Sequence, residues 1–286
     1  MKITLFGVRG TSPVTGAQFS RYGGDTTSLL VEGAEGEMIA LDAGTGIRRL
    51  GERLRQGEKQ NSLLVLMTHY HLDHIIGLPL FRPLYEGKWK ITFAANARAE
   101  KAPEEIIPRI LAQPFWPLQI EDLQARIDFR TLAGSSSRRP LHHGALRVRW
   151  SPLHHPGGCT AYRFDEPDGG ASFVFATDGE WQESTPEEKE AFRRLCDVPG
   201  PPDLLIFDGQ FGPTNYKKFR GWGHSSWADA VEVSRLVKAE KLLITHHAPE
   251  NDDNHLDQVE AELKKSLPEA RLGRAGMELS LENRNE

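Results

Sequence analysis

The sequence of 286 residues is poor in cysteine, has no surplus of basic residues and contains no long apolar run. Its two cysteines, Cys159 and Cys196, lie far apart and make no disulfide framework, so we expect a reducing, cytoplasmic environment. The net charge of −5 argues against general nucleic-acid binding, and we expect no nucleic-acid partner. The apolar runs are far shorter than a membrane span and the N-terminus does not resemble a signal peptide, so we expect no membrane association.

No internal repeat and no linker-like stretch divides the chain, which is long enough to bury a substantial core. We therefore predict one domain over residues 1–286. Residues 96–145 differ from the rest because they are rich in proline and contain the polar run Gly134–Arg139. This composition predicts that residues 96–145 form an insertion or lid.

Strand-dominated halves, each followed by helices, predict an α/β (α+β) fold in which sheets pack face to face with helices outside. The expected strands are Lys2–Val8, Ser28–Glu32, Glu37–Leu41, Ser62–Met67, Trp89–Ala95, Leu146–Trp150, Ala161–Phe164, Ser172–Ala176, Asp203–Phe207, Lys241–Thr245 and Met277–Leu281. The expected helices are Ile47–Gln56, Asp73–Tyr85 with breaks near its two prolines, Pro103–Leu111, Ser226–Lys238 and Asn254–Ser266. Residues 283–286 should fray.

Residues 69–74 read His-Tyr-His-Leu-Asp-His and follow a short apolar run. In an extended segment the side chains of residues i and i+2 point the same way, so His69 and His71 can bind one ion together. Asp73 and His74 follow where the chain turns into a helix, and they can hold a second ion. Imidazole and carboxylate suit zinc and also manganese or iron. The alternative, a cluster of surface histidines, fits poorly with the buried strand that precedes it.

Later strands also end in residues that can bind metal. His154–His155, Asp178 and His246–His247 each follow a strand-like segment. Ligands at the ends of successive strands converge on one edge of a sheet. Because adjacent residues on a strand face opposite ways, only one histidine of each pair should be a ligand.

With these residues in view, the sequence resembles a metallo-β-lactamase-fold hydrolase from about residue 2 to residue 250. It carries that family's H-x-H-x-D-H block and its upstream acidic loop, with Asp42 in LDAGTG. The resemblance implies a four-layer αββα sandwich with two divalent ions on one edge, zinc being expected and manganese or iron being alternatives. One ion would be held by His69, His71 and His155, the other by Asp73, His74 and His246, with Asp178 bridging both.

Within that superfamily the sequence resembles the ribonuclease Z and cyclic-phosphodiesterase branch. His155 precedes Tyr162-Arg163 by seven residues, and Gly223-His224-Ser225-Ser226 resembles the branch's His-Ser-Thr motif. Asp208 lies where that branch has an acidic residue that can pair with this histidine.

This second resemblance implies hydrolysis of a small or cyclic phosphodiester by a hydroxide between the ions. His224 would contact the phosphate or protonate the leaving oxygen, so Asp73, His224 and Asp208 are the expected catalytic residues. Asp42 and Asp208 would orient imidazoles. Relatives in the branch are often dimers, which makes a homodimer compatible with the sequence.

Other functions stay open. For tRNA 3′-end processing the sequence lacks a Pro-x-Lys-x-Arg-Asn loop, and only 22 residues separate His155 from Asp178, too few for a tRNA-gripping arm. Hydrolysis of an ester, lactone or thioester is a further alternative, and a metal-holding module without hydrolysis is the last.

Two groups of residues are candidates for substrate contact. Arg9, Thr11 and Ser12 lie in a glycine-containing loop that could hold a phosphate or could be an ordinary turn. Tyr216 and Arg220 belong to a small basic patch before His224, which could attract an anion or could be a solvated surface.

Overall fold

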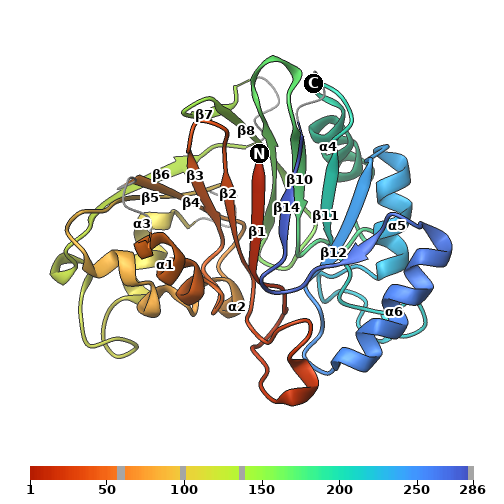
Figure 1. Ribbon diagram of the computed structural model, residues 1–286, viewed down its shortest axis with the longest axis horizontal. Helices are drawn as coiled ribbons and strands as arrows, with labels where there is room; N and C mark the ends of the chain where they lie inside the picture. Colours follow the sequence, from red (N-terminus) through yellow and green to blue (C-terminus); the bar gives the residue numbers. More distant parts are fainter. Residues whose placement is uncertain (57–61, 97–100, 135–138, 283–286) are drawn as a thin grey trace.

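The computed structural model describes residues 1–56, 62–96, 101–134 and 139–282. Most of the polar run predicted at Gly134–Arg139, and the predicted fraying of 283–286, lie outside the described residues. The described strands form two seven-stranded mixed sheets that face each other (Figure 1). None of the described helices is long and apolar enough to cross a membrane.

The first sheet joins the N-terminal half of the chain to the C-terminal strand. Its order is β14 (Glu278–Ser280), β1 (Lys2–Gly7), β2 (Ser28–Glu32), β3 (Met38–Leu41), β4 (Ser62–Met67), β5 (Lys90–Asn96) and β6 (Arg126–Leu132). β2 and β3 form an antiparallel hairpin, with Glu32 opposite Met38. β3 to β6 run parallel, so their carboxyl ends lie at one edge.

The second sheet has the order β13 (Arg271–Leu272), β12 (Lys241–Thr245), β11 (Leu204–Asp208), β10 (Ser172–Ala176), β9 (Cys159–Asp165), β8 (Leu146–Leu153) and β7 (Leu141–His143). β10, β11 and β12 are parallel to one another. β9 is antiparallel to both β10 and β8, so β8 runs in the same direction as β10. Because β13 is also parallel to β12, five strands of this sheet end at the same edge.

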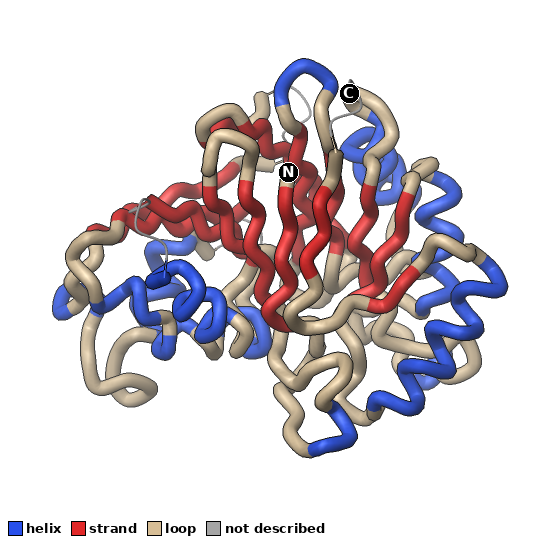
Figure 2. The backbone as a smooth tube through the Cα atoms, viewed as in Figure 1, coloured by secondary structure: helices blue, strands red, loops and turns tan. Residues whose placement is uncertain are grey.

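Helices cover the outer face of each sheet (Figures 1 and 2). α1 (Ile47–Gln56) and α3 (Pro103–Ile110) lie on the first sheet, whereas α4 (Pro186–Asp197), α5 (Trp227–Leu236) and α6 (Asp253–Ser266) lie on the second. One apolar core fills the space between the sheets, with Leu66 from one side and Phe164 from the other. Two further cores lie between each sheet and its helices. The predicted αββα sandwich is confirmed.

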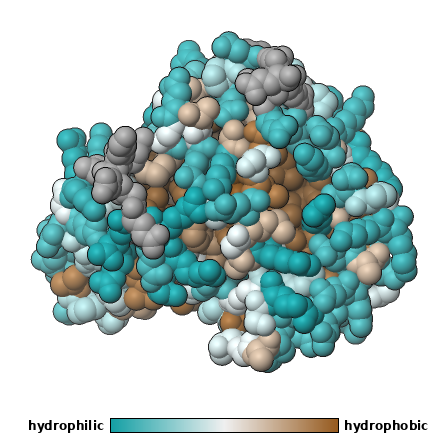
Figure 3. Space-filling model, viewed as in Figure 1, coloured by the Kyte–Doolittle hydropathy of each residue, from teal (hydrophilic) through white to brown (hydrophobic). Residues whose placement is uncertain are grey.

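The face drawn in Figure 3 fits this layering. Hydrophobic residues gather toward its centre, over the strands, while its flanks are mostly hydrophilic. The helices thus present their polar sides to solvent and their apolar sides to the sheets.

Prolines explain the main change in helix length. The helix predicted at Asp73–Tyr85 is a short α2 (Leu72–Ile75) followed by two 3₁₀ turns, η2 (Leu78–Leu80) and η3 (Arg82–Tyr85). Pro79 and Pro83 lie within those turns, and each lacks the N–H that a continuous helix needs. Further 3₁₀ turns are η1 (Ala17–Phe19), η4 (Ile120–Asp122), η5 (Pro167–Gly169) and η6 (Tyr216–Lys218).

Besides 3₁₀ turns, four elements were not predicted, one of them the two-residue strand β13. α4 begins with a capping box in which the Thr185 hydroxyl accepts from the Glu188 N–H and the Glu188 carboxylate accepts from the Thr185 N–H. β6 and β7 lie in the segment expected to be an insertion or lid, and they extend the first and second sheets respectively. Much of residues 96–145 is therefore part of the sandwich, and α3 lies beside the first sheet.

Candidate metal centre

The strand directions bring the predicted ligands to one edge of the sandwich, where loops gather beneath both sheets in Figure 2. His69 follows β4 and Asp42 follows β3, both from the first sheet. From the second sheet, β8, β10 and β12 lead to His155, Asp178 and His246. Residues far apart in sequence thus meet because their strands end together.

Three of these residues have a left-handed backbone conformation. Asp42 (φ 56°), Asp178 (φ 56°) and His246 (φ 65°) all lie just beyond a strand end. For a residue with a Cβ atom this conformation costs about 1 kcal/mol, and such costs concentrate at functional sites. The turn stops each strand abruptly at the edge where the cluster lies.

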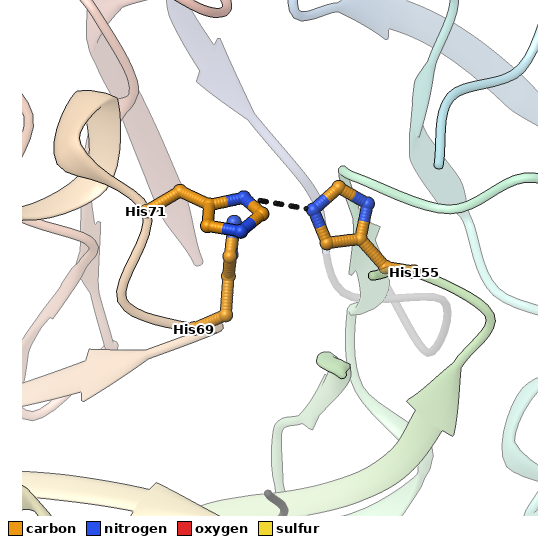
Figure 4. A group of neighbouring side chains, drawn as sticks. All are labelled: His69, His71 and His155. Atoms are coloured by element: carbon orange, nitrogen blue, oxygen red, sulfur yellow. Dashed lines mark hydrogen bonds between the residues drawn. The ribbon is translucent and has the colours of Figure 1, made fainter. Parts of the chain in front are cut away.

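A first group of ligands consists of His69, His71 and His155 (Figure 4). Each offers a ring nitrogen within 4.8 Å of the others. Nε2 of His155 lies 3.0 Å from Nδ1 of His71, and the rings point toward a common centre. Nε2 of His69 is buried and has no hydrogen-bond partner among the residues that the structure describes.

A second group consists of Asp73, His74, Asp178 and His246, all buried. Nε2 of His246 lies 3.2 Å from Asp73 Oδ2 and 3.1 Å from Asp178 Oδ1. Asp178 Oδ2 lies 3.2 Å from His74 Nε2, while its Oδ1 lies 3.8 Å from His69 Nε2 of the first group. Asp178 therefore lies between the two groups.

The electrostatics of the two groups differ. Burial lowers the pKa of His155 to about 4 and that of His69 well below its usual value. Burial alone would also lower the pKa of His246, but Asp178 and Asp73 raise it to about 10. Burial alone would raise the pKa of Asp178, yet the surrounding imidazoles hold it well below its usual value. The buried carboxylates therefore require nearby positive charge.

These observations fit a metal site. Neutral imidazole and carboxylate donors converge in two groups, and two imidazole nitrogens of different residues approach to 3.0 Å. Within the described parts of the chain, one of the donor nitrogens is buried without a hydrogen-bond partner. Divalent ions would accept the lone pairs of the imidazole nitrogens. They would also replace the protons whose positive charge otherwise balances the negative charge of the carboxylates. The described residues are thus compatible with a binuclear centre.

The structure brings only one histidine of each neighbouring pair to the cluster. His154 lies 3.0 Å from a Glu188 oxygen of α4, and its side chain is 38% exposed. His247 is buried, and its Nε2 donates to the carbonyl of Gly273 at 2.9 Å. His155 and His246 are the members that face the cluster, in the register that the resemblance implies.

Asp42 has the orienting position expected of it. Its carboxylate accepts from the Thr68 N–H and the Thr68 hydroxyl, and its Oδ2 lies 2.8 Å from Nδ1 of His74. Asp42 is completely buried, so this contact fixes the ring of His74 with Nε2 toward the cluster.

Asp208 and His224 form a second buried pair at the same edge. Nδ1 of His224 lies 2.8 Å from Asp208 Oδ2, and the ring stacks on His246 with centroids 4.8 Å apart. Asp208 also accepts from the N–H groups of Asp178 and Gln210. Because Nδ1 of His224 is hydrogen-bonded to Asp208, its Nε2 remains available to contact another group.

The residues predicted to contact substrate are distributed differently. The Thr11 N–H donates to Asp73 Oδ2 at 2.8 Å, so this residue lies at the cluster. Arg9 is completely buried and donates to backbone carbonyls, which binds the loop to the C-terminal half of the chain. Ser12 is exposed, and its N–H donates to the carbonyl of Gly10. The structure does not bring Arg9 to the cluster, because its guanidinium is used in packing.

The basic patch has its own partners. The Tyr216 hydroxyl is buried against Glu180 at 2.6 Å. Arg220 is 66% exposed and pairs with Glu183. Neither side chain is directed to the cluster by these contacts.

Two residues that sequence reasoning missed support the site. Gln210 Oε1 lies 2.8 Å from Nδ1 of His246 and orients that ring. Glu180 is completely buried, and besides Tyr216 it accepts from the N–H groups of Gly221 and Gly223. The carbonyl of Gly223 in turn accepts from Nδ1 of His155 at 2.8 Å. Glu180 thereby holds the loop that orients His155 and leads into His224.

A close approach makes Gly223 necessary in that loop. Its φ is +90°, and a Cβ atom there would lie 2.2 Å from His155 Nδ1. Only glycine combines this conformation with that approach.

A comparison with protein families finds that the model described as the beta-lactamase superfamily domain matches residues 37–247. A ribonuclease Z of Haloarcula marismortui is 22% identical over 287 residues, covering 86% of each chain. A ribonuclease Z of Bradyrhizobium diazoefficiens is 24% identical, covering 86% of this chain and 90% of its own.

Solved structures share the fold at low identity. The metallo-beta-lactamase fold protein YhfI from Bacillus subtilis has a TM-score of 0.68 at 20% identity, covering 97% of this chain and 98% of its own. The short form of human tRNase Z has a TM-score of 0.69 at 17% identity, with 98% and 99% coverage. A diphosphatase of the PhnP family has a TM-score of 0.67 at 19% identity, with 99% and 98% coverage.

Proposed function

The chain belongs to the beta-lactamase superfamily domain family, and we propose that it is a binuclear metal-dependent phosphodiesterase acting on a small or cyclic phosphodiester. The observation that carries the phosphodiester assignment is the buried His224–Asp208 pair beside the two ligand groups. A ligand cluster alone is compatible with several hydrolytic reactions, whereas a histidine with a free Nε2 adds a proton donor.

In this proposal His69, His71 and His155 hold one ion, Asp73, His74 and His246 hold the other, and Asp178 contacts both. We propose zinc as the resident metal, with manganese or iron as alternatives. Ions bound there would supply Lewis acidity, both for activating water at neutral pH and for offsetting charge on phosphoryl oxygens.

The role of His224 follows from its contacts. Asp208 fixes Nδ1, so the ring presents Nε2 and a proton on it can pass to the leaving oxygen as the phosphorus–oxygen bond breaks. The stacking on His246 keeps this imidazole next to the second ligand group. Asp208 acts as a positioning residue, since it contacts His224 rather than substrate.

The chain between His155 and Asp178 supports a small substrate. That interval consists of β9, the turn η5 and β10, all within the described residues, and leaves no room for an extended RNA-binding arm. The names of the curated relatives keep tRNA 3′-end processing as a second candidate. The net charge of −5 favours the small substrate.

The test is a substrate panel with protein loaded with zinc or manganese. We expect hydrolysis of bis-p-nitrophenyl phosphate or of a 2′,3′- or 3′,5′-cyclic nucleotide, no gel shift of precursor tRNA, and much slower hydrolysis of p-nitrophenyl acetate. If the protein hydrolysed p-nitrophenyl acetate but none of the phosphodiesters, the proposal would be refuted in favour of an esterase. Specific cleavage of precursor tRNA would favour the second candidate.

A further inference from the structure

A cavity of about 480 Å³ opens directly beside the first ligand group. His69 and His71 form part of its wall, together with Thr68, and Gly157 and Gly158 form another part. This volume lies in the range of small-molecule sites. A substrate whose phosphate lies at the ligand cluster therefore has room beside it for one substituent.

Much of the remaining wall is apolar. Ile106 and Ile110 lie one helical turn apart on α3, and Leu72 and Ile75 come from α2. Phe115 also lines the cavity. A hydrocarbon chain that lies along these side chains leaves water, and each methylene group that is buried in this way favours binding.

Two cations complete the wall. Lys101 lies just before α3, and Arg109 lies on α3 three residues after Ile106, so the two side chains share a face of the helix. Both cationic residues are exposed to solvent. None of the described residues that line the cavity is acidic. The cavity therefore has positive charge that the described part of its own wall does not balance.

Neither cation is paired within the described part of the chain. Lys101 and Arg109 form no ion pair or hydrogen bond with a described residue, although Glu105 lies one helical turn before Arg109. Glu104 and Glu105 do not line the cavity, and Glu104 accepts from the Thr131 hydroxyl of β6 at 3.4 Å. The two cations are therefore available to an anion that enters the cavity.

We propose that this cavity binds a substituent with an apolar body and an anionic end, a carboxylate or a phosphate group, as the non-leaving part of the phosphodiester. The body packs against Ile106, Ile110 and Leu72. The anionic end pairs with Lys101 and Arg109, and the guanidinium group of Arg109 can contact two anionic oxygens at once. This inference rests on the proposed function, because it assumes that the phosphodiester group lies at the ligand cluster.

The test uses diesters that share one leaving group and differ only in the other substituent. The n-pentyl, 4-carboxybutyl, 4-phosphonobutyl and 5-aminopentyl esters of p-nitrophenyl phosphate all release p-nitrophenolate, so one absorbance assay compares their kcat/KM. We expect kcat/KM to be about five- to tenfold higher for an anionic ester than for the n-pentyl ester, and lowest for the 5-aminopentyl ester. The ratio between the two anionic esters identifies which anion the cavity prefers.

Two results of this series would overturn the inference. One is equal kcat/KM for the n-pentyl ester and both anionic esters, and the other is a preference for the 5-aminopentyl ester. Either result would leave the phosphodiesterase proposal intact, because all four compounds would still be hydrolysed.

Two substitutions assign the charge preference to the cations of the wall. K101Q and R109Q should each reduce the advantage of the 4-carboxybutyl ester over the n-pentyl ester about two- to threefold, and together they should abolish it. R49Q is the matched control and should keep the advantage, because Arg49 is exposed on α1 and does not line the cavity. An advantage that survived both substitutions together would overturn the assignment.

The apolar body is tested separately. We expect kcat/KM to rise about tenfold from the methyl ester to the n-pentyl ester, and I106A to reduce this rise about threefold. I127A is the matched control, because Ile127 is half-buried on β6 and does not line the cavity. Equal values for the methyl and n-pentyl esters would overturn the apolar part of the inference.

A binding measurement keeps the two proposals distinguishable. Calorimetry with the metal-loaded protein can compare n-pentyl phosphate with 4-carboxybutyl phosphate, which are products and need no turnover. Tighter binding of 4-carboxybutyl phosphate, lost when K101Q and R109Q are combined, would support the cavity even if no diester were hydrolysed. Identical affinities of the wild type for the two phosphates would overturn the inference regardless of any activity.

Discussion

Replacing Glu180 by glutamine tests how the loop before His224 is held. The carboxylate accepts three hydrogen bonds: Tyr216 and Gly221 donate to Oε1, and Gly223 donates to Oε2. In E180Q one oxygen becomes an NH₂ group, so in either amide orientation a backbone N–H, that of the buried Gly223 or that of the exposed Gly221, faces another donor. The substitution keeps the shape and removes acceptor capacity.

The magnitude follows from these contacts. A lost hydrogen bond together with a buried unsatisfied group costs about 2 to 4 kcal/mol in the free energy of unfolding. Because the Gly223 carbonyl also accepts from His155, the loop shift should weaken metal binding about 10- to 100-fold. Urea denaturation of the metal-free protein measures the first effect, and competition with a chelator measures the second.

Glu183 provides the control, because it pairs with the exposed Arg220. We expect E183Q to change the unfolding free energy by less than about 0.5 kcal/mol and to leave metal affinity unchanged. If E180Q behaved like E183Q in both measurements, the assignment of Glu180 as the residue that holds this loop would be refuted.

Three further predictions concern single residues at the edge of the sandwich where the two ligand groups lie. D208N should lower kcat about 10- to 100-fold with metal content retained, since it removes the charge beside Nδ1 of His224 and leaves every ligand side chain unchanged; loss of metal by elemental analysis would contradict this. H155A should lose bound metal while H154A keeps it, and the reverse would overturn the register of this segment. Burial lowers the pKa of His247 from 6.5 to about 3, so the unfolded chain binds one more proton between these values. Stability of the metal-free protein should therefore fall by up to about 1.4 kcal/mol per pH unit as the pH drops through this window, and H247N should flatten the profile in urea titrations.

The family and the sandwich architecture were predictable because their evidence is local. The His and Asp residues at 69–74 directly follow a buried strand. A strand that ends in a residue able to bind metal can be recognised from a short stretch of sequence. The resemblance also placed Asp208 and His224 together, and the structure brings them within 2.8 Å. The helix break after residue 75 followed from prolines, whose effect is also local.

The supporting residues were not predictable because their partners are distant in sequence. Glu180 contacts backbone groups about 40 residues away, and a lone glutamate after a turn carries no indication of them. Arg9 was a candidate for anion binding, yet its partners include Ala248 and Asn251 at the other end of the chain. β6 was not predicted because it is an edge strand with a partly exposed, polar sequence.

Metal titration of the stripped protein tests the central claim most directly. Zinc or manganese would be added in steps while p-nitrophenolate release from bis-p-nitrophenyl phosphate and bound metal are measured together. We predict that activity appears with metal binding and reaches its plateau at two ions per chain, as two ligand groups joined by Asp178 require. Two bound ions without phosphodiester hydrolysis, or full activity in the stripped protein, would contradict the account.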